Sequence, residues 1–262
     1  MPVHFDIKDG VALITLSRPE IRNAWCDEFK ETVIARFPEL EHDPEVRCVV
    51  ITGDEAGKAF SAGADLKKPG AHEVPSTGEF LAALPDWKRA AINVVAEFPK
   101  PVIAAVNGHA VGVGCVLTLC CDLVVASEQA NWRMPQVRLG ISPAYAAWPR
   151  LARVIGRGQA MKMAMGYSVD AAEAYRIGLA QWLAPHEKLM DKALEIAREI
   201  ALLPPLATRL NKESLLRGQE IGNLSEAALV DVYRLMALEL TEDKTEAHQA
   251  WKEKRPGKYK AR

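Results

Sequence analysis

The sequence predicts an α/β fold whose strands pair in parallel. Short apolar runs at residues 47–53, 101–108 and 122–127 have the length of buried strands. Amphipathic helical stretches separate these runs, and such alternation is typical of crossover connections between parallel strands. The chain has 262 residues, of which 49% are hydrophobic, so it can bury one large core.

The N-terminal half supplies a hairpin and two helical stretches. Residues 3–17 contain two strand-like runs around Asp9-Gly10, a pair that favours tight hairpin turns. Residues 24–41 and 80–98 have the apolar spacing of helices. The predicted apolar faces are Phe29, Val33 and Phe37 in the first helix, and Trp87, Ala91, Val94 and Val95 in the second. Between them, residues 67–79 are rich in Pro, Gly and polar residues and predict a mobile loop.

The last third of the chain predicts helices only. Residues 189–203 and 225–243 carry helical apolar stripes. The first stripe comprises Met190, Ala193, Leu194, Ala197, Ile200 and Ala201. We therefore expect a core at residues 1–190 and a helical region at residues 191–262, whose stripes are covered by the core or by a second subunit.

Composition excludes several classes of function. The net charge is −1 and both signs are spread along the chain, which argues against nucleic acid as a partner. The basic end at residues 252–262 is expected to be solvated. No apolar run approaches the ~20 residues of a membrane span, and the N-terminus lacks a signal pattern. The five cysteines form no CxxC pair, so we expect reduced, buried thiols, no metal and a cytoplasmic location.

Two segments rich in small residues carry the predicted chemistry. Residues 58–68 contain a run from Ser61 to Ala64, and residues 107–117 contain Gly112 and Gly114 before an apolar helix. If the N–H groups of Ala64 and Val113 point at one spot, they form an oxyanion hole, reinforced by the positive end of the helix. One such donor contributes about 10²–10³ in rate.

The glycines have alternative explanations. Gly112 and Gly114 are not a dinucleotide fingerprint, because Leu117 stands where a third Gly or Ala is expected. No Gly-Lys-Ser/Thr follows, so the segment is not a P-loop either. For either segment alone, a tight turn remains an alternative.

Taken together, the segments are more specific. The chain resembles the crotonase, or enoyl-CoA hydratase/isomerase, superfamily over essentially its whole length. The matching stretches are LSRPEIRNAW (16–25), VRCVVITG (46–53), KAFSAGADLK (58–67), KPVIAAVNGHAVGVGC (100–115), CDLVVAS (121–127), MPQVRLGISP (134–143), GYSVDAAEAYRIGLA (166–180) and AHQAWKEKRPGKY (247–259). The resemblance implies a crotonase-like spiral of ββα turns, with C-terminal helices that pack into trimers or dimers of trimers.

The resemblance also implies an acyl-CoA thioester as ligand. Its carbonyl would lie between the N–H groups of Ala64 and Val113, and coenzyme A would enter as part of the substrate, with no separate cofactor. The positions implied to contact CoA or the acyl group are Arg22, Asn23, Ala24, Ala62, Gly63, Asp65, Leu66, Lys67, Gly112, Val116 and Trp148. Lys67 and Lys68 are either phosphate ligands or ordinary solvated lysines.

The chain departs from the family pattern at its acid–base positions. Typical hydratases carry two glutamates, and Val116 and Gln136 occupy those positions here. Neither side chain exchanges a proton at neutral pH, and acid–base groups each contribute about 10²–10⁴ in rate. We therefore expect poor water addition by the usual route.

Several residues are candidates for the missing proton donor. Tyr145 is favoured, because it replaces a small residue of the family, although it would equally serve to fill the pocket. His109 and Asp65 are further candidates, with structural roles as the alternative, and Gln136 could hold a water or a substrate carbonyl. Trp132 is expected to pack in the core. Tyr145, Trp148 and Trp87 either line an acyl pocket or belong to the core.

Three functions remain open from the sequence. The first is an acyl-CoA lyase or isomerase with an unusual proton donor. The second is a decarboxylase or C–C hydrolase on the same scaffold, because decarboxylation needs no base to create the enolate. The third is a non-catalytic homologue that binds acyl-CoA.

Overall fold

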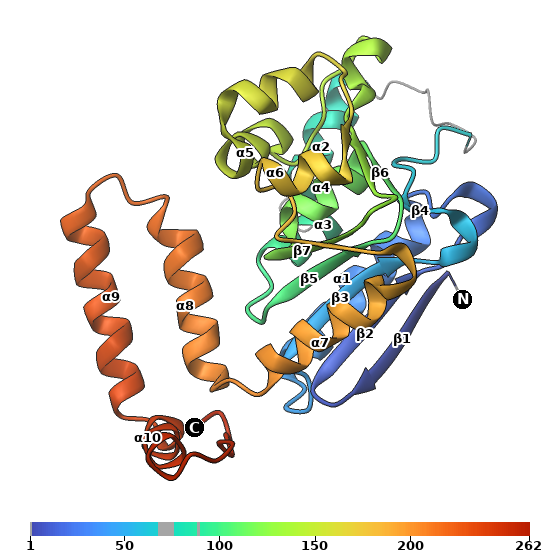
Figure 1. Cartoon of the computed structure of the whole chain (residues 1–262). Coiled ribbons are helices and arrows are strands. Elements are labelled where there is room, and N and C mark those ends of the chain that lie inside the picture. The colour runs from blue at the N-terminus through green and yellow to red at the C-terminus, as the bar shows by residue number, and fades with distance from the viewer. Residues whose placement is uncertain (1, 68–75, 88–89) are drawn as a thin grey trace.

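The computed structural model describes residues 2–67, 76–87 and 90–262, without the side chains at positions 80 and 84–87. These residues form two β-sheets flanked by helices, and C-terminal helices extend away from the sheets (Figure 1). The predicted α/β class is confirmed. Most of the predicted loop at 67–79 falls on positions 68–75, which lie outside the described residues.

The larger sheet contains every strand that the sequence predicts. Its order is β1-β2-β3-β5-β7-β10, with β1 Val3–Lys8, β2 Val11–Leu16, β3 Cys48–Gly53, β5 Val102–Val106, β7 Leu123–Ser127 and β10 Trp182–Ala184. The predicted hairpin is confirmed: β1 and β2 pair antiparallel, and Asp9 and Gly10 both take positive φ, as the mirror-image hairpin turn requires. The remaining pairs are parallel, as predicted.

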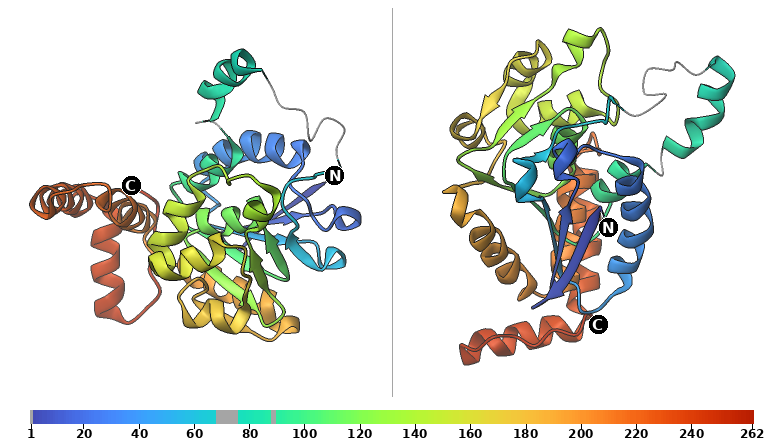
Figure 2. Two further views of the ribbon diagram at one scale, coloured as in Figure 1. Left: turned by 90° about the horizontal axis from the view of Figure 1, so that it is seen from above. Right: turned by 90° about the vertical axis from the view of Figure 1, so that its right-hand side faces the viewer.

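Successive residues of the central strands face two different cores. In β3, Val49 and Ile51 belong to the main core, whereas Cys48 and Val50 face a second, smaller core. Helix α1 (Asp27–His42) covers the first face and α7 (Leu189–Ala201) covers the other (Figure 2). Because both faces are covered, these strands read as continuous apolar runs. The predicted α1 face is confirmed, since Phe29, Val33 and Phe37 are buried.

The smaller sheet was not predicted, and it carries the loops of the candidate site. Its order is β4-β6-β8-β9, with β4 Ala59–Ser61, β6 His109–Val111, β8 Asn131–Arg133 and β9 Val169–Asp170. β4, β6 and β8 pair in parallel, so the segments that follow β4 and β6 leave the sheet at the same edge. Helix α4 (Val113–Cys120) begins directly after β6.

The single helical stretch predicted at 80–98 is wrong. The structure has two helices, α2 (Thr77–Trp87) and α3 (Ala91–Ala96), and Ala90 before α3 has an extended backbone with ψ 141°. Packing accounts for the separation: Ala91, Ile92 and Val95 are buried, whereas Leu81 in α2 is exposed. The predicted face residue Trp87 has its side chain outside the described part.

Among the described residues, four 3₁₀ helices and two α-helices, one of them the 18-residue α5, make up the other elements before α7. They are η1 Pro19–Ile21, η2 Glu55–Gly57, η3 Pro135–Leu139, α5 Ala147–Ala164, α6 Ala171–Arg176 and η4 His186–Lys188. After β10 the described chain contains helices and no further strand, as predicted, and ends in a non-helical tail after Glu253.

The C-terminal helices divide into one that packs on the sheet and others that do not. The apolar stripe of α7 lies in the second core, where Leu189 and Ile196 join the predicted residues. Helices α8 (Pro205–Gly218) and α9 (Leu224–Glu239) contain no buried residue and stand side by side away from the sheets (Figure 1). Helix α10 (Glu242–Glu253) precedes the C-terminal tail, which its buried Asp243 holds by accepting the N–H groups of Lys260 and Ala261.

Candidate functional site

The two predicted loops of small residues lie against each other. β4 pairs with β6 through Ser61 and Ala110, and the loops continue in contact beyond this pair. A Cβ atom on Gly63 would lie 2.8 Å from the carbonyl oxygen of Val111, and one on Gly114 would lie 2.5 Å from that of Ser61. Both distances are too short for a side chain, so the approach of the two backbones requires glycine at these positions.

The segment predicted to contact CoA joins the same place. The carbonyl of Arg22 accepts a hydrogen bond from the N–H of Ala62 (3.0 Å), and the N–H of Trp25 donates to the carbonyl of Gly63 (2.7 Å). Trp25 also forms a parallel β-bridge with Ala64. Three stretches far apart in the sequence therefore converge on Ala64.

Asn23 within this segment has a structural role. It is fully buried, and its side-chain amide makes three hydrogen bonds to backbone atoms of Arg18, Asp54 and Ala59. The predicted contact between this position and CoA is therefore not supported, because no part of Asn23 reaches the surface. The side chain of Arg22 is exposed, while Ala24 is buried.

The two predicted oxyanion donors are free. Gly112 caps α4 with φ 54° and ψ −117°, and Val113 is the first residue of the helix, where an N–H group has no partner within the helix. Among the described residues, no group accepts a hydrogen bond from the N–H of Val113 or of Ala64. Ala64 is exposed and Val113 half-buried, so a ligand can reach both.

Gln136 lies at the same turn. Its Nε2 atom is 3.2 Å from where a Cβ on Gly112 would be, so the glycine also makes room for this amide. Its Oε1 atom is buried and has no hydrogen-bond partner among the described residues. Val116, one turn into α4, is buried. The carboxylate of Asp65 accepts a hydrogen bond from the backbone N–H of Lys67 (3.0 Å), two residues further along the same loop.

The aromatic candidates lie at the start of α5. Tyr145 and Ala146 take left-handed backbone conformations, with φ of 61° and 53°, and the carbonyl of Tyr145 accepts a hydrogen bond from Arg150 Nε (3.1 Å). The side chains of Tyr145 and Trp148 pack, partly buried, against the main core. The structure is therefore compatible with either predicted role of these two residues, as a wall of the acyl pocket or as part of the core.

The remaining sequence candidates fall into two groups. Trp132 is buried and donates to the hydroxyl of Thr118 (3.1 Å), which confirms its predicted packing role. His109 on β6 is exposed, as are Leu66 and Lys67. Lys68 lies outside the described residues.

The cysteines are free, as predicted, and four of the five are buried, with Cys121 half-buried. Burial raises the pKa of the Cys115 thiol in α4 to about 12 and that of Cys120 to about 11. A thiol with such a pKa is protonated at neutral pH and is not a nucleophile.

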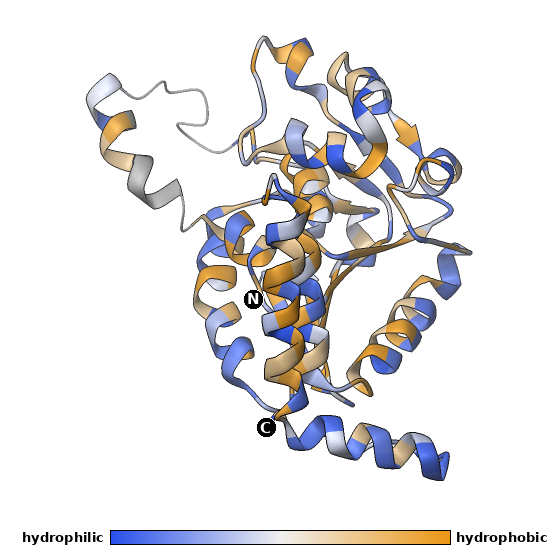
Figure 3. Ribbon diagram, turned by 90° about the vertical axis from the view of Figure 1, so that its left-hand side faces the viewer, coloured by the Kyte–Doolittle hydropathy of each residue, from blue (hydrophilic) through white to orange (hydrophobic). Residues whose placement is uncertain are grey.

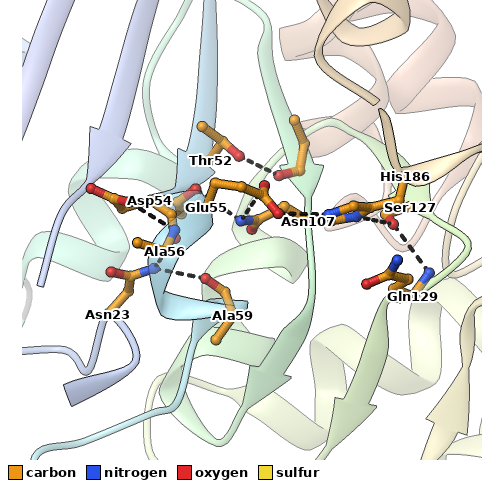
Figure 4. A network of polar contacts seen from close by, with 12 residues as sticks. Asn23, Thr52, Asp54, Glu55, Ala56, Ala59, Asn107, Ser127, Gln129 and His186 are labelled. Atoms are coloured by element: carbon orange, nitrogen blue, oxygen red, sulfur yellow. Dashed lines mark hydrogen bonds and ion pairs between the residues drawn. The ribbon is translucent and has the colours of Figure 1, made fainter. Parts of the chain in front are cut away.

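Sequence reasoning missed a polar network behind the loops (Figure 4). His186 joins Ser127 through Nδ1 (2.9 Å) and Glu55 through Nε2 (2.6 Å), and Asn107 Nδ2 donates to the carbonyl of Gly53 (2.9 Å). Ser127 is fully buried, so its hydroxyl is closed to a substrate, and the series links the end of β7 to the segments that follow β3 and β10. No local sequence motif marks it, because its members are over 50 residues apart.

Two further findings concern metal binding and membrane insertion in the described part of the chain. No cluster of three or more His, Cys, Asp or Glu side chains in this part of the chain is arranged to hold a metal ion. None of the helices found there has the length and apolarity needed to span a membrane.

The sequence and the structure are both similar to those of known proteins. Residues 6–262 match the family model for enoyl-CoA hydratase/isomerase. The 2,3-dehydroadipyl-CoA hydratase of Escherichia coli is 35% identical over 254 residues, which cover 96% of each chain. The crystal structure of an enoyl-CoA hydratase from Bacillus anthracis superposes with a TM-score of 0.91 at 32% identity, covering both chains completely. An enoyl-CoA hydratase/isomerase from Mycobacterium paratuberculosis gives a TM-score of 0.89 at 31% identity, covering 100% of this chain and 99% of the other. The crotonase-like fold is confirmed by these matches.

Proposed function

The chain belongs to the enoyl-CoA hydratase/isomerase family, and on this premise we propose that it binds an acyl-CoA thioester and stabilises its enolate. The N–H groups of Ala64 and Val113 are the proposed donors to the thioester oxygen. The observation that carries this proposal is that both N–H groups are free of partners on loops held in contact. Negative charge that develops on the oxygen would also meet the positive end of α4.

The same site lacks the groups that hydration needs. Addition of water to an enoyl thioester requires a base to take a proton from water and an acid to deliver one to the α-carbon. Val116 is a buried apolar residue and Gln136 a neutral amide, so neither performs these steps. The proposed activity is therefore that of an acyl-CoA lyase or isomerase other than a standard hydratase, with Tyr145 as the proposed proton donor.

A second candidate function follows from the same two residues. In decarboxylation, the C–C bond to a β-carboxylate breaks, its electron pair forms the thioester enolate, CO₂ leaves, and a proton then returns to the α-carbon. This sequence needs the oxyanion donors and a proton source but no initial base. A C–C hydrolase would share the enolate, and a homologue that binds acyl-CoA without turnover is the remaining alternative.

The rest of the ligand and the setting are proposed accordingly. The exposed side chains of Arg22 and Lys67 would face the CoA phosphates, and the loop from Ala62 to Leu66 would follow the pantetheine arm. Coenzyme A enters as part of the substrate, and no other cofactor is proposed. We place the protein in the cytoplasm as a trimer or a dimer of trimers.

Binding of a matched pair of ligands tests the oxyanion donors directly. Butyryl-CoA has a thioester carbonyl, whereas S-butyl-CoA has a methylene group in its place and is otherwise the same. Calorimetry should show that butyryl-CoA binds about tenfold tighter or more, because a hydrogen bond lost at a buried site costs about 1–3 kcal/mol. Equal affinity for the two ligands would refute the proposed site.

A backbone variant assigns the effect to Val113. Proline is tolerated at the first position of a helix, so Val113→Pro removes the N–H group with little change in the helix. The variant should bind both ligands with nearly equal affinity, whereas Val113→Ala, which keeps the N–H, should behave as the wild type. Circular dichroism verifies that Val113→Pro is folded.

A further inference from the structure

Gln136 presents an amide to the oxyanion turn without a partner for it in the protein. Nε2 lies beside Gly112, the residue that precedes the donor Val113. The acceptor end of the amide, Oε1, is buried and unpaired among the described residues. The donor end, Nε2, makes no hydrogen bond to the described residues and is not among their buried unpaired atoms, so it is available to a ligand.

The chemistry around this amide favours an oxygen-bearing ligand. A glutamate at position 136 would present negative charge and repel a carbonyl or carboxylate oxygen, whereas a glutamine offers N–H donors. Val116 contributes no charge, and the carboxylate of Asp65 is engaged by the N–H of Lys67. The turn therefore combines N–H donors with one carboxylate, that of Asp65, which accepts a backbone N–H of its own loop.

We propose that Gln136 determines specificity by donating a hydrogen bond from Nε2 to a second oxygen of the acyl group. Gln136 Nε2 lies beside Gly112 and Val113 is the next residue in the chain, so two donors at one turn would suit two oxygens in a 1,3 relationship, one on the thioester carbonyl and one on the β-carbon. The substrate class is then an acyl-CoA with a carbonyl or carboxylate at the β-carbon, of the 3-oxoacyl or malonyl type. This inference rests on the proposed function.

Binding of three short CoA esters to the whole protein tests the inference. Malonyl-CoA and acetoacetyl-CoA carry the second oxygen, and butyryl-CoA has the same chain length as acetoacetyl-CoA without it. We expect the wild type to bind at least one oxygenated ester about tenfold tighter or more than butyryl-CoA, measured by calorimetry with chromatography of the recovered ester. The preferred ester distinguishes the 3-oxoacyl from the malonyl class.

Variants separate the amide from the rest of the site. Gln136→Met keeps the size of the side chain and removes its polarity, so it should abolish the preference for the oxygenated esters over butyryl-CoA. Gln136→Glu should weaken malonyl-CoA binding further by charge repulsion. Gln159→Met is the matched control, because Gln159 in α5 has a similarly buried, unpaired Oε1, and it should retain the wild-type preference.

The outcomes for the inference and for the proposed function differ. Equal binding of all three esters by the wild type, or a preference that survives in Gln136→Met, overturns the role of Gln136 while the acyl-CoA site stands. Failure of the wild type to bind any of the esters overturns the proposed function, and this inference with it.

Discussion

Tyr145 and Ala146 form one of two adjacent non-glycine pairs with positive φ among the described residues, the other being Arg22 and Asn23. Tyr145 and Ala146 lie directly before α5, and a left-handed conformation of a non-glycine residue costs about 1–3 kcal/mol. The resemblance to the family leads us to expect glycines and small polar residues here, and of these only glycine would avoid that cost. The strain therefore accompanies the placement of an aromatic ring and its hydroxyl, which supports a functional role for Tyr145.

Replacing Tyr145 with Phe tests that role with the smallest change. The ring stays and only the hydroxyl is removed, so packing against the main core is preserved. If the hydroxyl donates a proton in the reaction, kcat for the substrate found in a CoA-ester screen should fall by about 10²-fold or more. An unchanged kcat would leave Tyr145 as a wall of the pocket only.

The residues of the candidate site were predictable where backbone chemistry defines them. The small residues around Ala64 and Val113 mark loops that need close approach, and the structure brings them into contact. Two features of the site were not predictable, because the residues that interact lie far apart in the sequence. They are the hydrogen bonds of the Asn23 side-chain amide to the backbone and the Ser127–His186–Glu55 series.

At the scale of elements, predictability follows length and burial. The central strands β3, β5 and β7 were predicted because both of their faces are covered, which leaves a clear apolar run. The strands of the smaller sheet are two or three residues long and show no periodicity to detect. The break between α2 and α3 was missed because the apolar spacing continues through it in the sequence.

Lys212 in α8 forms a largely buried ion pair with Asp122, the residue directly before β7. Lys212 Nζ lies 2.6 Å from Asp122 Oδ2 and donates to the carbonyl of Lys100 (3.0 Å), and only 10% and 20% of the two paired side chains are exposed. Burial raises the pKa of the Asp122 carboxyl even though Lys212 opposes the shift. Lys212 therefore stabilises the ionised form of Asp122, which burial alone would destabilise.

Lys212→Met should lower the free energy of unfolding by about 3–5 kcal/mol at pH 7, since it leaves a buried charge unpaired. Because the pKa of Asp122 is raised in the folded state, the carboxyl is protonated more readily there, and the deficit should shrink as the pH falls through that pKa. Urea denaturation at several pH values measures both effects.

The double variant Lys212→Met/Asp122→Asn serves as the control for this pair. The neutral amide still accepts the N–H of Val102, which Asp122 holds at 2.7 Å, and most of the lost stability should return. A single variant that unfolds within about 1 kcal/mol of the wild type would show that the pair does not anchor α8.

For the whole molecule, the α8–α9 pair has no covering layer in the isolated chain. Figure 3 shows apolar residues along these helices on the face turned towards the viewer. The large apolar side chains exposed on them are Leu215, Leu216, Leu224, Leu229, Val232, Tyr233, Leu235 and Met236. Exposed apolar surface of this extent is typical of an interface, so we expect other copies of the chain to cover it.

Light scattering at micromolar concentration should therefore give three or six times the chain mass of 28.8 kDa. Leu229→Asp/Met236→Asp should reduce this mass, because charge on an apolar interface opposes association. Ile34→Asp places the same change on an exposed position of α1 and is the control. A strictly monomeric wild type would contradict the assembly.

Hydration of crotonyl-CoA tests the central claim most directly, namely that this site stabilises an enolate without the acid–base pair of a hydratase. Loss of the enoyl-thioester absorbance should be slow or absent with the wild type. It should rise in Val116→Glu/Gln136→Glu, and less in either single variant, because two groups that act on one water are not additive. Fast hydration by the wild type would contradict the account, since proton transfer would then come from groups other than positions 116 and 136.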